Sequence, residues 1–103
     1  MPTRFEQLQA MLQKEPSDPF LLYGIAMEYK KQNNPASAID YFNRTLAADS
    51  GYCYAYFQSG QVHESTGDTV AARKAYQDGI AAAQKKGDAH AMSEISAALD
   101  MLG

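Results

Sequence analysis

Residues 52–86, YCYAYFQSGQVHESTGDTVAARKAYQDGIAAAQKK, hold the pattern that decides the predicted fold. On both sides of the turn Thr66-Gly67-Asp68, apolar residues recur with the period of one face of an α-helix. The stretch therefore predicts two amphipathic helices, neither of which can bury its apolar face alone. The segments before and after it resemble shifted copies of its two halves, which indicates that further helices of the same kind supply the cover.

Six helices are predicted along the chain, at residues 3–13, 20–32, 36–48, 52–65, 69–84 and 89–102. Each break recurs after a helix-sized interval, and the alternating apolar–polar runs that indicate strands are absent from the sequence. Four polar residues stand where helices are expected to begin: Thr3, Asp18, Asn34 and Asp68. Gly67 is typical of the residue just past a helix end, so it is expected to close the helix at residues 52–65.

A shift of 34 residues along the sequence, as from Leu8 to Phe42, brings the core positions of the chain into register without gaps. The aligned sets are Leu8, Phe42 and Tyr76; Leu12, Leu46 and Ile80; Met11, Thr45 and Gly79; Leu22 and Tyr56; Ala26 and Gly60; and Ala38 and Ala72. Agreement in size and polarity at so many spaced positions indicates an internal repeat. Small residues such as Gly60 are expected to let paired helices approach closely, with Ala72 opposite, while large ones such as Tyr76 fill the space toward the next helix.

These aligned residues resemble the signature of the tetratricopeptide repeat (TPR) family. That signature has an aromatic residue, Leu-Gly and Tyr on the first helix of each unit, followed by Ala, Phe and Ala on the second. The matching residues are Leu22, Ile25, Ala26, Tyr29, Ala38, Phe42 and Thr45 in one unit, and Tyr56, Ser59, Gly60, His63, Ala72, Tyr76 and Gly79 in the next. The proline that closes the family's unit is present only as Pro16, since Ser50 and Gln84 stand in its place in the two units.

The resemblance implies an all-α fold, a right-handed solenoid of antiparallel helix pairs with about six helices. It covers nearly the whole chain, and residues 1–103 are expected to form a single domain. The implied parts are a half-repeat helix at residues 1–18, full repeats at 19–52 and 53–86, and a C-terminal capping helix at 87–103. Glu94 departs from the pattern because a small residue is expected there, and a terminal helix without a following partner does not require one.

Composition and charge argue against several classes of partner. The formal net charge is −3 and the pI about 5.2, so the chain offers no positive field for nucleic acid or for an anionic membrane. No apolar run approaches the roughly 18 residues of a membrane span, and the first residues show no signal-peptide pattern. Cys53 is the only cysteine, so no intrachain disulfide can form, and a cytoplasmic location is predicted.

Motifs for catalysis, cofactor binding or metal binding are absent from the sequence, which has no HExxH, no CxxC and no Gly-rich phosphate loop. His63 takes the family's inner tyrosine position and is expected to pack in the core. Cys53 has no basic neighbour in sequence to lower its pKa, so it is expected to be an inert thiol. We therefore predict no enzyme, no catalytic residue, no cofactor and no metal ion.

By resemblance, the first helices of the units line a concave groove. The implied groove positions are Phe20, Tyr23, Met27, Lys30 and Lys31, then Tyr54, Phe57, Gln61, Glu64 and Ser65, and finally Ala91 and Ile95. Apolar and aromatic patches of this kind usually mark a binding surface. The alternative is that the terminal helices fold over the patch and make it ordinary core.

Two functional hypotheses follow from the groove. The first is a module that binds an apolar or aromatic segment of another protein, with Lys30 and Lys31 selecting acidic neighbours at one end. The second is a structural module that buries the same patch, or an open helix face, in a homodimer or larger homo-oligomer. Family members that hold a chaperone's C-terminal carboxylate use Lys and Asn on the first helix, Asn on the second, and Lys and Arg on the third. The matching positions here are Tyr23, Met27, Gln58, Asp88 and Met92. None carries positive charge, which argues against that ligand.

Overall fold

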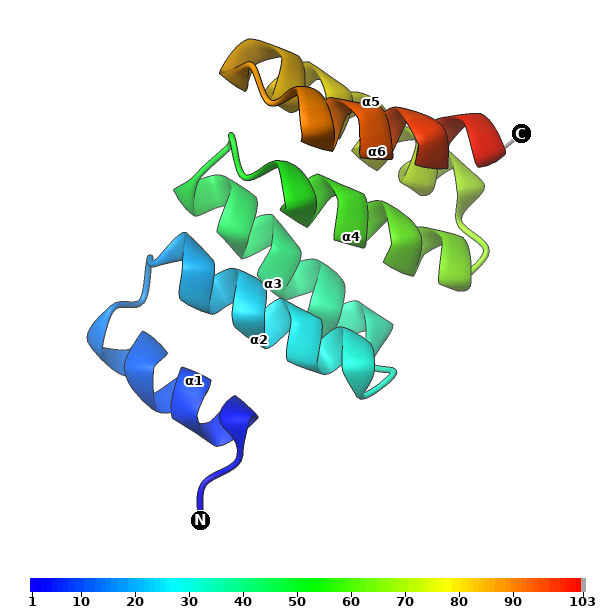
Figure 1. The fold of residues 1–103 in the computed structure, drawn as a ribbon. Coiled ribbons are helices and arrows are strands. Elements are labelled where there is room, and N and C mark those ends of the chain that lie inside the picture. The colour runs from blue at the N-terminus through cyan, green and yellow to red at the C-terminus, as the bar shows by residue number, and fades with distance from the viewer. Residues whose placement is uncertain (103) are drawn as a thin grey trace.

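The computed structural model describes residues 1–102, and these residues form six α-helices and no strand (Figure 1). The helices are α1 (Arg4–Lys14), α2 (Pro19–Lys31), α3 (Pro35–Ala48), α4 (Cys53–Ser65), α5 (Thr69–Lys86) and α6 (Ala89–Met101). The six predicted helices are confirmed, each end lying within two residues of its predicted place. The largest difference is at α5, which continues past Gln84 until Gly87 adopts a left-handed conformation with φ 76°.

The helices form two layers along a body of 43 × 30 × 19 Å. Helices α2, α4 and α6 lie side by side, with α4 in contact with both neighbours, and α3 and α5 pack behind the gaps between them (Figure 1). Helix α1 packs against α2 at the N-terminal end of the array. This arrangement confirms the predicted all-α solenoid of helix pairs.

The turns between paired helices repeat along with the helices themselves. Asn34 and Asp68, which occupy equivalent positions in the two repeats, both cap the second helix of a pair by accepting a backbone N–H, from Ser37 in the first case and Ala71 in the second. The residues before them, Asn33 and Gly67, both take positive φ, 59° and 82°. The two repeats therefore share the backbone conformation of this turn as well as the sizes of their core side chains.

The core also follows the period. Phe42 and Tyr76 are both 0% exposed, and the equivalent residue of the leading helix, Leu8, is buried as well. Each belongs to its own apolar cluster, and the three clusters follow one another along the solenoid. Every helix therefore depends on its neighbours for cover, as expected for a repeat array.

Gly60 makes room for a ring rather than for a backbone. A Cβ placed at Gly60 would lie 2.7 Å from Cδ1 of Tyr76 and closer still to Cε1, so the Tyr76 ring occupies the space that any side chain at position 60 would need. The expectation that Gly60 mainly admits the backbone near Ala72 therefore needs correction. Gly79 likewise leaves room for side chains of other helices. A Cβ placed at Gly79 would lie 2.8 Å from Cβ of Tyr56 on α4 and 3.1 Å from Cδ1 of Ile95 on α6.

Gly60→Ala is expected to lower the free energy of unfolding by about 1–3 kcal/mol, because the added methyl group forces the Tyr76 ring out of its place. The better helix propensity of alanine offsets only about 0.5–1 kcal/mol of that loss. Gly24→Ala is the matched control, since a Cβ there meets only the mobile end of Leu8 at 3.3 Å. Chemical denaturation of both variants tests this, and equal stabilities would contradict the role given to Gly60.

Candidate functional site

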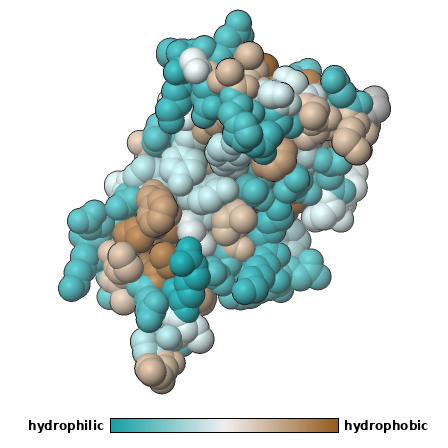
Figure 2. Space-filling view, in the orientation of Figure 1, coloured by the Kyte–Doolittle hydropathy of each residue, from teal (hydrophilic) through white to brown (hydrophobic). Residues whose placement is uncertain are grey.

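The predicted groove residues on α2 and α4 all keep some exposed surface. Phe20 is 64% exposed, Lys31, Glu64 and Ser65 are also exposed, and the others are half-buried: Tyr23, Met27, Lys30, Tyr54, Phe57 and Gln61. We call the surface formed by these six half-buried residues the inner face. In the view of Figure 2, the strongest hydrophobic colour lies over α1 and the start of α2, while the surface over α4 is paler.

The groove positions assigned to α6 are wrong. Ala91 and Ile95 are both 0% exposed and belong to the apolar cluster of Tyr76 and Ala83. Their equivalents on α4, Phe57 and Gln61, are long enough to emerge from the helix pair. Ala91 is too short to do so, and Ile95 instead turns toward the space that Gly79 leaves open. On α6 these two positions therefore belong to the core.

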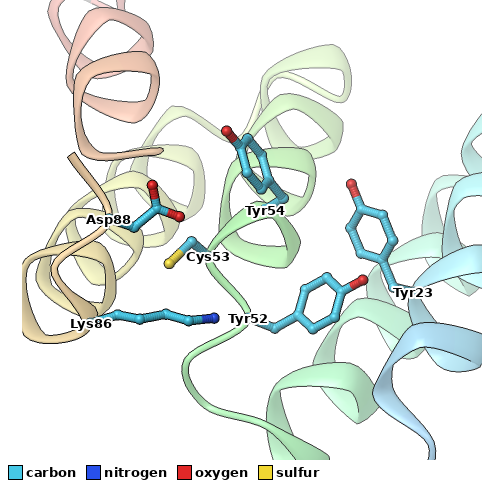
Figure 3. Close-up of a pocket in the computed structure, with 6 residues that line it drawn as sticks. All are labelled: Tyr23, Tyr52, Cys53, Tyr54, Lys86 and Asp88. Carbon is cyan, nitrogen blue, oxygen red and sulfur yellow. The ribbon is translucent and has the colours of Figure 1, made fainter. Parts of the chain in front are cut away.

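Three tyrosines, one from α2 and two from the start of α4, gather around a hollow of about 250 Å³, which we call the tyrosine pocket (Figure 3). Its lining residues are Tyr23, Tyr52, Cys53, Tyr54, Lys86 and Asp88. The rings of Tyr23 and Tyr52 lie 4.9 Å apart between centroids, at 35° to one another. Sequence reasoning placed Tyr23 and Tyr54 on this surface and matched Asp88 to a ligand position of the family, but it missed Tyr52 and Lys86. The repeat gives the same indication for Asp88, which lies one full period after Tyr54.

The pocket wall is electrically neutral at its tyrosines. Burial raises the pKa of Tyr23 and Tyr52, with nearby Asp18 and Asp49 adding to the shift at Tyr52. Burial and then the Glu94 carboxylate raise the pKa of Tyr54, whose hydroxyl donates to Oε1 of Glu94 at 3.2 Å. All three hydroxyl groups therefore stay protonated at neutral pH and present apolar rings with polar tips.

The remaining pocket residues have structural partners. Burial raises the pKa of the Cys53 thiol, so it stays protonated, in line with the inert role expected for it. The Asp88 carboxylate accepts from the backbone N–H of Ala91 at 3.0 Å and caps α6. The Lys86 ammonium donates to the carbonyl oxygen of Gly51 at 3.4 Å. The thiol, carboxylate and ammonium groups of the pocket wall are therefore better suited to bind a side chain than to react with it.

A polar cluster adjoins the pocket along the inner face. Nζ of Lys30 donates to Oε1 of Gln58 at 2.5 Å and to Oε1 of Gln61 at 2.8 Å, which joins α2 to α4. The Gln58 side chain is also hydrogen-bonded to Tyr23. Burial lowers the pKa of Lys30. Sequence reasoning named Lys30 and Gln61 for this surface but gave no role to Gln58 as a link between them.

Residues 1–102 contain no cluster of three or more His, Cys, Asp or Glu side chains that could hold a metal ion. Within the same residues, none of the helices has both the length and the apolar character needed to cross a bilayer.

Glu64 is engaged by the core and not only by the inner face. Its carboxylate accepts a hydrogen bond from the hydroxyl of Tyr76, whose ring is 0% exposed. Burial, then this hydrogen bond and the charge of Glu64, raise the pKa of Tyr76 above its ordinary value of 10.0. Unfolding returns Tyr76 to its ordinary pKa, so the unfolded chain loses the proton first as pH rises.

The free energy of unfolding is therefore expected to fall as pH rises above about 10, by at most about 1.4 kcal/mol per pH unit for this one proton. Tyr76→Phe removes the titrating group, so its stability is expected to decline less over the same range. Urea denaturation between about pH 9 and pH 11.5 measures the difference. A Tyr76→Phe variant with the pH dependence of the wild type would show that Tyr76 contributes nothing to it.

Comparison with known proteins agrees with this architecture. Over 97 residues the chain is 28% identical to TPR repeat-containing protein PA0015 of Pseudomonas aeruginosa, covering 94% of this chain and 92% of that protein. The solution structure of protein BPP2914 from Bordetella parapertussis superposes with a TM-score of 0.85 at 28% identity, covering 99% of this chain and 89% of that one. PcrH in complex with the chaperone binding region of PopD has the same fold, with a TM-score of 0.88 at 15% identity over 95% of this chain and 74% of that one.

The sequence profile of the tetratricopeptide repeat matches residues 21–52 and 54–86, each match running from the first helix of a pair to the end of the second. Because the two matches together span more than half of its residues, this chain belongs to the tetratricopeptide repeat family.

Proposed function

We propose that this chain is a protein-interaction module whose inner face binds a short segment of another protein. The observation that carries the proposal is the tyrosine pocket, a hollow of about 250 Å³ walled by three neutral, partly exposed tyrosine rings. Tyrosine gives a large contact area at a small loss of side-chain freedom, and it is enriched among the residues that dominate binding energy. The pocket therefore suits an apolar or aromatic side chain of the partner.

The structure of PcrH supports this use of the fold. That protein was solved in complex with the chaperone binding region of PopD, so its similar arrangement of helices holds a segment of a different protein. At 15% identity the likeness concerns the fold alone.

A C-terminal carboxylate is not the ligand that we propose for the tyrosine pocket. The residues that match the family's carboxylate-binding positions carry no positive charge: Tyr23, Met27, Gln58, Asp88 and Met92. Asp88 lies in the pocket wall with a carboxylate of its own, which would repel a second one. An apolar side chain from within a segment fits these groups better.

Self-association is the second candidate, and the N-terminal end of the molecule favours it. Phe20 is 64% exposed and Met11 is 53% exposed, and the hydrophobic colour in Figure 2 gathers over α1 and the start of α2. A second copy covering this end would make a homodimer. Light scattering over a range of concentrations separates the two candidates, because a monomer at all concentrations leaves no self-interface to bury the patch.

We also propose a non-enzymatic role and a cytoplasmic location. The first is supported by membership of a family whose members typically act as scaffolds. The second rests on the single cysteine, Cys53, which allows no intrachain disulfide.

The double variant Tyr23→Ala/Tyr54→Ala is expected to reduce partner recovery about tenfold or more, because it removes two rings of the pocket. The measurement is recovery of proteins from a lysate of the source organism on the immobilised wild type and variant, with circular dichroism to verify folding. Val70→Ala is the matched control, since Val70 is 77% exposed on α5, in the other layer of helices. If the double variant recovers the same partners as the wild type, the inner face is not the binding surface.

A further inference from the structure

The Lys30 ammonium is half-buried on the inner face without a carboxylate beside it. Lys30 takes no part in the ion pairs Arg4–Glu28, Arg44–Asp40 and Lys74–Asp78. Its hydrogen-bond partners, Gln58 and Gln61, are both neutral amides. Half-burial of an ammonium group disfavours its charged form unless an opposite charge lies near. In a chain with a net charge of −3, such an uncompensated cation is notable.

The equivalent position of the second repeat carries a carboxylate with a partner of its own. Glu64 is the equivalent of Lys30 in the second repeat, and its carboxylate accepts from the Tyr76 hydroxyl. An ammonium group has three N–H donors, and Lys30 uses two of them on Gln58 and Gln61. One donor and the full positive charge are therefore left for a group from outside the chain.

We propose that Lys30, held in place by Gln58 and Gln61, binds the side-chain carboxylate of an Asp or Glu residue in the partner segment. This inference rests on the proposed function, since it assigns a second subsite on the same inner face. The carboxylate would accept a charge-assisted hydrogen bond from the third N–H of the ammonium group. The amide of Gln61, whose Oε1 atom accepts from Lys30, would have its N–H₂ group left as a further donor.

The spacing of the two subsites follows from helix geometry. Tyr54, Gln58 and Gln61 stand at i, i+4 and i+7 on α4, and Tyr23 and Lys30 stand seven residues apart on α2. At about 1.5 Å of rise per residue, the tyrosine pocket and the Lys30 subsite lie about 10 Å apart along the helices. An extended chain covers that distance in about three residues. The partner segment is therefore expected to carry its acidic residue about three positions from a large apolar or aromatic residue.

Selection from a library of random nine-residue peptides tests this inference. The peptides are displayed with their C-termini fused to the carrier, so that no terminal carboxylate is free. Wild type is expected to enrich peptides with Asp or Glu two to four residues from a large apolar residue. Lys30→Met keeps the length of the side chain but removes its charge, so it is expected to retain the apolar preference and lose the acidic one. Lys14→Met is the control, because it changes the net charge equally at an exposed position on α1, outside the inner face.

The contribution of the peptide's acidic residue to binding is then measured with one selected peptide, synthesised with an acetylated N-terminus and an amidated C-terminus. Replacing its acidic residue by the matching amide is expected to weaken binding to wild type about tenfold, as measured by fluorescence anisotropy, and to change binding to Lys30→Met by less than about twofold. An equal loss with both proteins would overturn the assignment of Lys30. The change in the peptide leaves the protein untouched, so this measurement on wild type stands even if Lys30→Met folds poorly.

The remaining outcomes separate this inference from the proposed function. Enrichment of apolar peptides with no acidic preference would overturn the Lys30 subsite and leave the tyrosine pocket in place. If no peptide is enriched, or if Tyr23→Ala/Tyr54→Ala selects the same peptides as wild type, both the proposed function and the inference fail. A preference for acidic residues that Lys14→Met abolishes as fully as Lys30→Met would indicate attraction by net charge alone and overturn the Lys30 subsite.

Discussion

The contact between Gly60 and the ring of Tyr76 is the constraint on which the second helix pair depends. Tyr76 is 0% exposed, and its ring lies where any side chain at position 60 would have to stand. A glycine on one helix and a large ring on the next form a complementary pair, so α4 and α5 can pack in only a narrow range of positions. The hydroxyl of the same ring donates to the carboxylate of Glu64, near the C-terminal end of α4. Tyr76 therefore fixes the middle of α4, at Gly60, and also its end. Once α4 is fixed, the places of Tyr54, Gln58 and Gln61 follow.

That constraint divides the residues of α4 between two tasks. Ala55, Ser59, Gly60 and Val62 are buried and hold the solenoid together. Tyr54, Phe57 and Gln61 lie between them in sequence and are half-buried, because successive residues of a helix point about 100° apart. One helix thus serves the core and the inner face at once. A substitution on the inner face can change what the surface recognises while leaving the core contacts intact.

Most of the fold could be predicted from the sequence, and the candidate site only in part. Helix ends are set by local chemistry, such as the cap of Asp68 and the positive φ of Gly67, and a single sequence carries that information directly. The tyrosine pocket is different, because Tyr52, Lys86 and Asp88 lie at helix boundaries, where periodicity along one helix assigns no face. Which of them meet depends on how three helices are placed relative to one another. Ala91 and Ile95 show the same limit, since their equivalence to Phe57 and Gln61 is correct in register, but side-chain length and the space at Gly79 decide their burial.

The two repeats agree where they pack and differ where they face outward. Their core pairs keep size and polarity, as with Ala38 and Ala72 or Phe42 and Tyr76, and all four are 0% exposed. On the inner face the equivalent pairs change character, from Met27 to Gln61 and from Lys30 to Glu64. Packing restricts the first set, because a change of one methylene is felt in a close-packed interior, and it leaves the second set free. The reversal of charge from Lys30 to Glu64 has a physical consequence: Glu64 is satisfied by Tyr76, while Lys30 has only neutral amides. The α2 side of the inner face therefore differs in charge from the α4 side. A segment bound along the inner face would bind in one defined orientation.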